Sequence, residues 1–402
     1  MSTIFCDTLV LTIVTIQKIS CTQVFLIKFY RQYLLPIGLL AGTIIGAGIF
    51  ALPFVFSGVG MPWGVLYLFI AVIAFILTHL MYGDIILRTP GSHRFVGYAN
   101  IYLGRLGYWF AIGATVVQMM FVLTIYVVLS ASFTHILFPA ASGIFPLLVF
   151  WVLSSMGIFF SLRRLAFVEF LVTWGIVAIV AFLFAYALPQ LDLLRWNFSV
   201  PLAATAFLPL AAILFSLSGR VAIPSLVALA PSHVPRLRRV IVWGTFLPAI
   251  VYAIFVFGVL ALSPVVSDDA VSGLLVALPH WLSLSIGVLG VLSLYSSYIV
   301  VGLDVKNILR FDLRLSSWLS GALVVVSPMI LYAVGFQNFI QLVGLIGGIF
   351  LGVEGICIVL MWRCLPRPTH GASQLVSPSL LVSFFVIMVF VLAACSQIVK
   401  MW

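Results

Sequence analysis

Charged side chains are scarce in this 402-residue chain, because 19 Lys or Arg and 9 Asp or Glu make up only 7% of it. Soluble globular proteins contain about 25% charged residues, so water is not the solvent for most of this surface. Hydrophobic residues reach 64%, and the mean hydropathy is +1.31. The formal net charge of +10 would suggest a nucleic-acid partner only if a basic face were exposed to water. The basic residues lie in short loops instead, so we expect a lipid bilayer and no nucleic acid as the partner.

Groups of residues that support catalysis or metal binding are also lacking. The five cysteines are scattered, with no C-x-x-C pair and no neighbouring His at metal-ligand spacing, so neither a disulfide framework nor a metal site is indicated. The six histidines are dispersed, and neither a Walker motif nor a G-x-S-x-G elbow occurs. We expect no enzymatic activity, no ATP-driven transport within this chain, no organic cofactor and no obligate protein partner.

Long apolar runs are abundant. A helix needs about 20 apolar residues to cross roughly 30 Å of hydrocarbon, and eleven stretches approach that length. They are 33–57, 63–86, 106–134, 143–160, 164–188, 203–230, 240–262, 282–303, 316–334, 339–362 and 377–398. The sequence therefore predicts an all-α membrane protein with eleven transmembrane helices.

Residues 1–32 precede these spans and are interpreted as an N-terminal leader. The apolar stretch Thr8 to Gln17 is short, and it lacks the basic n-region and cleavage site of a signal peptide. A disordered segment, a surface helix and an over-extended start site remain the alternatives.

The loop charges predict an orientation in the membrane. With the N-terminus in the cytoplasm, the outer segments hold only Arg195 and Lys400. The inner segments hold fifteen basic residues: Lys28, Arg31, Arg88, Arg94, Arg105, Arg163, Arg164, Arg236, Arg238, Arg239, Lys306, Arg310, Arg314, Arg363 and Arg367. This asymmetry follows the positive-inside rule, so we expect a cytoplasmic N-terminus and an external C-terminus in a bacterial or archaeal inner membrane.

The span order also suggests internal symmetry, because many carriers consist of two inverted five-helix repeats around a midplane site. The segment Gly91 to Gly104 after the second span is long, inside and partly helical in pattern, and its counterpart Ser263 to His280 is long and outside. We predict a first repeat at 33–188, a second at 203–362 and an additional helix at 377–398.

The first span carries a strong break signal. Gly42, Gly46 and Gly48, followed by Pro53, weaken helical pairing in its middle. Backbone groups freed at membrane depth must be satisfied by protein or by a water-filled cavity, and amides at the start of a half-helix can receive a carboxylate. The alternative is that the pair Gly42 and Gly46 only lets two helices pack closely.

The sixth span is interrupted too, by Phe215-Ser216-Leu217-Ser218-Gly219-Arg220 with Pro224 just beyond. Freed backbone groups and serine hydroxyls can bind an amino group or a carboxylate, and Phe215 can close over a side chain. Serines in membrane helices also commonly bond back to the preceding turn. The pairing with the first span favours a binding site.

Ionisable residues inside a bilayer are costly and are functional candidates. Glu354 lies within the tenth span, where a proton carrier and a structural partner are both possible roles, and Arg220 adjoins the sixth-span break. Asp84, Glu169 and Asp304 lie near inner span ends, where snorkelling to the interface or pairing with loop arginines is the simpler explanation. In the eighth span, Ser293, Ser296 and Ser297 offer hydroxyl oxygens of the kind a sodium ion accepts, although packing explains them equally well.

The segment Gly42 to Pro53 resembles the first-helix signature of amino acid permeases in the amino acid-polyamine-organocation superfamily, nearest to the aromatic amino acid and amino acid/auxin permeases. Ser296-Ser297-Tyr298 and Gly347-Gly348 through Glu354-Gly355 also resemble that branch, and the likeness covers about 30–400. The resemblance implies a leucine-transporter-like fold with broken first and sixth helices.

The same resemblance implies site residues. Gly46, Ala47 and Gly48 would meet the substrate carboxylate, and Phe215, Ser216 and Ser218 would meet its amino group and side chain. Carbonyls of Gly42 and Ile45 with hydroxyls of Ser296 and Ser297 would form a sodium position. Some proton-coupled relatives carry a lysine on the fifth helix instead, and none occurs here. Arg220 departs from the family pattern, and leaves open whether it serves coupling or binds an anionic substrate.

We therefore expect a secondary symporter of neutral, bulky or aromatic amino acids, driven by sodium or protons through alternating access. An uncoupled exchanger or facilitator and a non-transporting membrane sensor with the same fold are the alternatives.

Overall fold

The computed structural model describes residues 28–91, 93–140, 143–158, 162–190, 207–229, 234–263, 265–274, 278–366, 374–377 and 379–401. These residues form helices and connecting loops, and no strand occurs among them. Of the predicted leader 1–32, only residues 28–32 fall within this part of the chain, where they begin the first helical region.

The helical elements follow the apolar runs closely. In chain order they are η1 (Tyr30–Leu34), α3 (Leu35–Ile44), η2 (Ala47–Ala51), α4 (Leu52–Val59), α5 (Met61–Arg88), α6 (Phe95–Leu137), α7 (Phe145–Gly157), α8 (Leu162–Ala187), η3 (Leu188–Gln190), α9 (Leu208–Ser216), η5 (Arg220–Ala222), α10 (Ile223–Leu229), α11 (Val234–Leu262), η6 (Ser272–Leu274), α12 (His280–Phe311), α13 (Ser317–Val334), α14 (Phe339–Leu345), η7 (Ile346–Phe350), α15 (Leu351–Arg363) and α16 (Leu380–Met401).

Within the described residues, nine helices are long and apolar enough to cross a membrane, and the bent pair Tyr30–Ile44 and Ala47–Val59 makes ten if it is one span. The predicted span 143–160 corresponds to α7, which has 13 residues. At 1.5 Å per residue α7 covers about 20 Å, less than the hydrocarbon thickness.

Two helices extend well beyond their predicted spans toward the basic loops. The α11 helix begins at Val234 rather than 240, and α12 continues to Phe311 rather than 303. Hydrophobicity marks only the part of a helix inside hydrocarbon, and helical hydrogen bonds continue past that limit. Pro235 fits the first turn of α11, where a backbone N–H has no helical partner.

The segment after the second span is helical from Phe95 onward, as its pattern predicted. The α6 helix starts at Phe95 and kinks at Gly104, whose φ of 69° and ψ of −163° leave the helical region. Such a positive φ is easily reached only by glycine. The kink separates the leading segment, which carries Arg94 at its N-cap and Phe95 at its start, from the long membrane-crossing part of α6.

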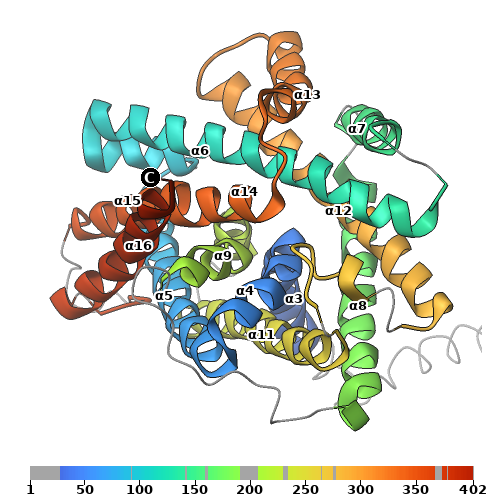
Figure 1. Ribbon diagram of the computed structural model, residues 1–402. Coiled ribbons are helices and arrows are strands. Elements are labelled where there is room, and N and C mark those ends of the chain that lie inside the picture. Colours follow the sequence, from blue (N-terminus) through green and yellow to red (C-terminus); the bar gives the residue numbers. More distant parts are fainter. Residues whose placement is uncertain are drawn as a thin grey trace, which may run out of the picture.

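Figure 1 shows how the two interrupted spans sit at the centre of the molecule. The α3, α4 and α9 helices lie there, with α6 crossing above them, α8 to one side, α11 below and α15 with α16 on the other side. The core of the protein therefore surrounds the places where two helices stop and restart.

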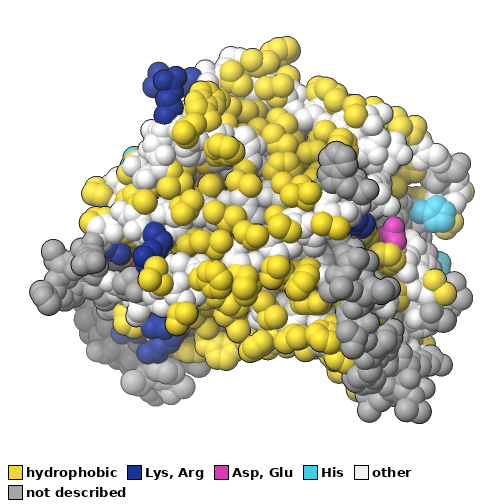
Figure 2. Space-filling model, turned by 60° about the vertical axis from the view of Figure 1, so that its left-hand side comes forward, with side chains coloured by type: hydrophobic (Ala, Val, Ile, Leu, Met, Phe, Trp, Pro, Cys, Tyr) yellow, Lys and Arg dark blue, Asp and Glu magenta, His cyan; other side chains and the backbone are white. Residues whose placement is uncertain are grey.

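The outer surface is apolar. Large side chains such as Leu106, Trp318 and Leu381 are at least 77% exposed, a pattern expected of a protein whose surface is largely solvated by lipid. Figure 2 shows a face covered with hydrophobic side chains, with most visible Lys and Arg gathered toward one side and most of the visible His and acidic side chains toward the other.

Asp84, near the C-terminal end of α5, interacts electrostatically with Arg88, but its direct hydrogen-bond partners are other groups. Its buried carboxylate accepts hydrogen bonds from the backbone N–H groups of Leu375 and Val376, at 2.8 and 3.2 Å, and from the Trp362 indole N–H at 3.2 Å. Arg88 donates to the Pro366 carbonyl instead. These bonds fix the connection that precedes α16 against the second span.

Candidate functional site

The first span is broken where its glycines predicted. The α3 helix ends at Ile44, and Ile45 (φ −72°, ψ 95°) and Gly46 (φ −142°, ψ −153°) are extended. A 3₁₀ turn over Ala47–Ala51 then leads into α4, with Pro53 in its first turn, and the two halves meet at a bend of 50°. The first N–H groups of a helix have no helical partner, so amides near Ala47 and Gly48 are available to a ligand.

The sixth span stops and restarts beside it. The α9 helix ends at Ser216, Leu217 and Gly219 leave helical geometry, and a 3₁₀ turn begins at Arg220 and leads into α10. The two halves of the sixth span remain nearly aligned, so that Pro209–Leu229 counts as one apolar span, whereas the two halves of the first span are bent by 50°.

The two breaks touch through their backbones. A Cβ atom on Gly48 would lie 2.5 Å from Cα of Ser216, closer than any side chain tolerates. A Cβ on Gly46 would meet nothing within 4 Å, and one on Gly42 would make only an ordinary 3.4 Å contact with Oγ1 of Thr173. The close approach therefore depends on Gly48, and the pair Gly42 and Gly46 is not explained by helix packing.

A single tyrosine on α11 links the two breaks. The Tyr252 hydroxyl, on α11, lies 2.7 Å from the carbonyl oxygen of Ile44 and 2.7 Å from that of Ser216. A phenol has one hydrogen, so this donor is shared between the last carbonyls of α3 and α9. Tyr252 has 0% exposure, and Ile44 and Ser216 are also buried. Without the Tyr252 hydroxyl, both of their carbonyl oxygens would lack this hydrogen-bond donor.

A cavity of about 140 Å³ lies between the broken spans, α6, α12 and α15. Nine of the twelve residues predicted for the site line it: Gly46, Ala47, Gly48, Phe215, Ser216, Ser218, Arg220, Ser297 and Glu354. Gly42, Ile45 and Ser296 do not line it. The predicted substrate-binding set is thus brought together, whereas the predicted cation set contributes only Ser297.

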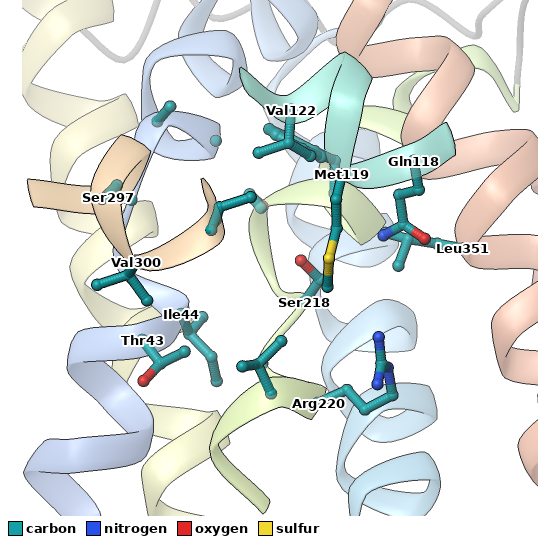
Figure 3. A pocket seen from close by; sticks show the side chains of 18 of the residues that line it. Thr43, Ile44, Gln118, Met119, Val122, Ser218, Arg220, Ser297, Val300 and Leu351 are labelled. Atoms are coloured by element: carbon teal, nitrogen blue, oxygen red, sulfur yellow. The ribbon is translucent and has the colours of Figure 1, made fainter. Parts of the chain in front are cut away.

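The eighth-span serines behave differently from one another. The Ser296 hydroxyl is buried and donates to the Ser293 carbonyl at 3.1 Å, the back-bond typical of a membrane helix. Ser297 lies one residue on and faces the cavity, as Figure 3 shows. The Ser216 hydroxyl also bonds back, to Ile213 at 2.8 Å.

Other lining residues were not found from the sequence. From α6 come Gln118, Met119, Val122 and Tyr126, and from elsewhere Thr43, Ile44, Gly219, Val221, Val300, Val301, Asp304 and Leu351. Gln118 carries a weak signal, because it is an amide within an otherwise apolar span. Figure 3 shows Gln118, Leu351 and Arg220 on one side of the cavity and Ser297, Val300 and Thr43 across from them.

Charges meet at one end of this cavity. Nε of Arg220 lies 2.7 Å from Oε1 of Glu354, and their side chains are 11% and 7% exposed. The Arg220 guanidinium also stacks over the Phe95 ring, 4.4 Å from its centroid. Burying either charge alone would be costly, and here each charge is compensated by the opposite charge of its partner.

Asp304 was expected near an inner helix end, but α12 continues past it and the residue lines the cavity. It interacts electrostatically with Arg220 and with Arg94. The cavity lining thus contains two carboxylates, Glu354 and Asp304, that both interact with the Arg220 guanidinium. Among the described residues, no group of three His, Cys, Asp or Glu side chains could hold a metal ion.

Fold and site together define a membrane transporter. The structure is similar to that of a nucleobase-cation-symport-1 family transporter in a closed conformation with bromovinylhydantoin bound, with a TM-score of 0.60, 13% identity, and coverage of 81% of this chain and 77% of that one. It is also similar to the manganese transporter of Eremococcus coleocola, as a mutant (TM-score 0.61, 12% identity, 93% and 86% covered) and in complex with an aromatic bis-isothiourea substituted compound (0.61, 12%, 91% and 85%). At these identities the likeness shows the fold alone, which is the leucine-transporter-like fold expected from the first-span motif.

The sequence itself is more specific. The chain belongs to the tryptophan/tyrosine permease family, whose model matches residues 31–397. No curated protein matches the chain. The family confirms the resemblance to amino acid permeases, and with the transporter neighbours it identifies an integral membrane protein that is a secondary transporter rather than an enzyme.

Proposed function

We propose that this protein carries aromatic amino acids across the membrane by alternating access, with the cavity between the two broken spans as the substrate site. The observation that carries the proposal is the convergence of both breaks on one cavity. Amides of Gly46, Ala47 and Gly48 can receive the substrate carboxylate, assisted by the positive end of the following half-helix.

The rest of the lining suits the remainder of such a substrate. The carbonyl end of α9 at Ser216, together with Ser218, can receive the amino group, because the C-terminal end of a helix is negative. Met119, Val122 and Phe215 supply apolar and aromatic surface for a ring. The family name points to tryptophan and tyrosine as the substrates.

We further propose that a sodium or proton gradient drives uptake. In support of sodium, Ser297 lines the cavity, and the family resemblance implies it as a cation ligand together with Gly42, Ile45 and Ser296. In support of protons, Glu354 is a carboxylate in the cavity wall. The substrate and one of these ions would bind together, and movement of the broken-helix bundle would expose both to the other side.

The proposed topology has eleven spans, as two inverted five-helix repeats and one additional helix, with the N-terminus in the cytoplasm of a bacterial or archaeal cell. The charge distribution supports this orientation, since Lys and Arg gather toward one side of the apolar band in Figure 2.

Exchange without ion coupling is a second candidate. The buried Arg220 favours it, because the site already contains a fixed cation paired with Glu354. An exchanger would need substrate on the opposite side and no ion gradient.

Uptake by purified protein in liposomes tests these proposals. We expect labelled tyrosine or tryptophan to accumulate under a sodium gradient or a proton gradient, and to stop when that gradient is removed. Accumulation that needs only internal amino acid would favour exchange. A failure to take up or exchange any amino acid under all these conditions would refute the transport proposal.

A further inference from the structure

Asp304 is a carboxylate in the cavity wall that neither the proposed substrate site nor the proposed sodium position uses. On α12, the residues Ser297, Val300, Val301 and Asp304 line the cavity, and their spacing places them on one face of the helix. Asp304 is half-buried, and within the part of the chain that the structure describes no hydrogen bond or ion pair reaches its carboxylate. Unlike Oε2 of Glu354, neither of its oxygens is an enclosed acceptor without a partner, so its carboxylate can be reached from the cavity.

The charges around Asp304 do not balance. Asp304 interacts electrostatically with Arg220 and Arg94, and Arg94 also interacts with Asp312 at the C-cap of α12. Arg220 is already paired with Glu354, at 2.7 Å. This group of charges contains three carboxylates and two guanidinium groups, so one negative charge lacks a counter-charge when all five side chains are ionised. Such an excess is costly away from water, and it favours the binding of one positive charge.

Of the three carboxylates, Asp304 is placed to receive that charge from the cavity. Glu354 has its cation in direct contact, which favours its ionised form. Asp312 is not among the described residues that line the cavity. Asp304 lines it, and its two cations act on it without a direct hydrogen bond.

A proton fits Asp304 better than a sodium ion does. A hard cation needs several oxygen ligands at once, and the cavity-lining side chains one turn before Asp304 are those of Val300 and Val301, which offer none. A proton needs a single oxygen. The carboxylic acid that results is neutral, and it leaves Arg220 with Glu354 and Arg94 with Asp312, so the charges of the group then balance.

We propose that Asp304, rather than Glu354, takes up the proton that accompanies each substrate molecule. An O–H bond forms on the carboxylate while the cavity is open to the side of higher proton concentration. It breaks when the cavity opens to the other side, and the proton returns to water. Protonation removes the attraction of Asp304 for Arg220 and Arg94, which links the proton to the restart of the sixth span and to the start of α6. This inference rests on the proposed function, and it names the coupling ion and the residue that carries it.

Proton-driven accumulation and exchange test Asp304 separately. Wild-type and D304N proteins are reconstituted in sodium-free liposomes, with the membrane potential held at zero and an inward gradient of one pH unit. Wild-type protein should accumulate labelled tyrosine up to roughly tenfold at one proton per substrate, and a pH dye should report acidification of the lumen when tyrosine is added. D304N should lose both signals. It should still exchange external for internal tyrosine at equal pH, because the amide resembles the neutral acid.

D304E and D312N are the controls. D304E keeps a carboxyl group that can bind a proton, and should keep proton-driven accumulation. D312N removes one negative charge from the same group of charges but leaves the cavity lining unchanged, and should keep it too. Loss of accumulation in D312N equal to that in D304N would overturn the assignment to Asp304.

A measurement on the wild-type protein covers the case in which D304N does not fold. Dicyclohexylcarbodiimide modifies protonated carboxyl groups in apolar surroundings. Mass spectrometry of the treated protein should find the modification on Asp304, and saturating tyrosine should change its extent. A modification pattern that spares Asp304 would overturn the proposal.

The outcomes separate this inference from the transport proposal. Proton-driven accumulation that survives in D304N overturns the role of Asp304 and leaves transport intact, as does wild-type uptake that moves no proton. Folded D304N that loses exchange together with accumulation also overturns it, and assigns Asp304 to binding of the substrate ammonium instead. Wild-type protein that neither takes up nor exchanges any aromatic amino acid refutes the proposed function and this inference together.

Discussion

The two interrupted spans differ in the polar groups that they place at membrane depth and in the partners of these groups. The first break contains only backbone and apolar side chains, and it bends the span by 50°. The sixth break keeps its alignment but places Arg220 beside the cavity, which requires Glu354 on another helix. The first break therefore leaves backbone groups for a ligand to meet, whereas the charge at the sixth break already has its partner within the protein.

The largest effect should come from separating the charges at the sixth break. R220L leaves the buried Glu354 carboxylate without its cation, and E354L leaves Arg220 with only Asp304 as a counter-charge; breaking such a buried pair costs about 3–5 kcal/mol. The double variant R220L/E354L removes both charges and should be far more stable than the sum of the single losses predicts. Thermal midpoints of the purified variants check this, and additive losses would contradict the direct pairing of Arg220 with Glu354.

The next effect should come from the contact between the breaks. G48A places a Cβ 2.5 Å from Cα of Ser216, and overpacking of this kind costs about 1–3 kcal/mol. G46A is the control, because its Cβ meets no atom within 4 Å. We expect G48A to lose uptake and thermal stability while G46A keeps its stability. Equal effects on stability would show that the breaks do not touch at Gly48.

A smaller effect should follow removal of the shared hydroxyl. Y252F keeps the ring but leaves the carbonyls of Ile44 and Ser216 without this donor, a loss of about 1–2 kcal/mol. Because the hydroxyl joins both breaks, KM for the substrate should rise together with the loss of stability. Reduced stability with unchanged KM would limit Tyr252 to a packing role.

The smallest effect should lie outside both breaks, in the loop that contains Asp269. Its carboxylate accepts hydrogen bonds from the Ser267 and Ser272 hydroxyls at 2.6 Å, and from the Ser272 N–H at 3.0 Å. Burial by itself would raise the pKa of Asp269, but these bonds and one from Ser132 outweigh it and hold the pKa below its ordinary value of 3.8.

A carboxyl with a lowered folded-state pKa stabilises the protein above its unfolded pKa, and this stability is lost as the pH falls through the folded pKa. D269N should therefore weaken the loop by about 1 kcal/mol near neutral pH. Its difference from wild type should shrink as the pH falls below about 4. Hydrogen exchange in residues 265–274 measures this, with uptake at neutral pH expected to stay unchanged. A difference that grows in acid would contradict the assignment.

Features that depend on residues close together in the sequence could be predicted, and features that depend on contacts between distant residues could not. Helices and the first break follow from local chemistry, since apolar run length, two close glycines and a proline act within a few residues. The helix ends of α11 and α12 were missed because hydropathy reports the lipid boundary and not the last hydrogen bond. The hydrogen-bond partners of Asp84 were not predicted, because the N–H groups of Leu375 and Val376 lie far along the chain.

The sequence by itself determined that this chain lies in a membrane, that its first span breaks at Gly46 to Gly48, and that Arg220 and Glu354 are exceptional charges. The first and the last rest on the cost of placing polar groups in hydrocarbon, and the break rests on the poor helix formation of glycine and proline; both depend on residue type and near neighbours alone. Only the tertiary structure decided that Arg220 pairs with Glu354, that Tyr252 joins the two breaks, and that Gln118 faces the cavity. These contacts join residues far apart in the chain, and their partners are chosen by helix packing rather than by any local pattern.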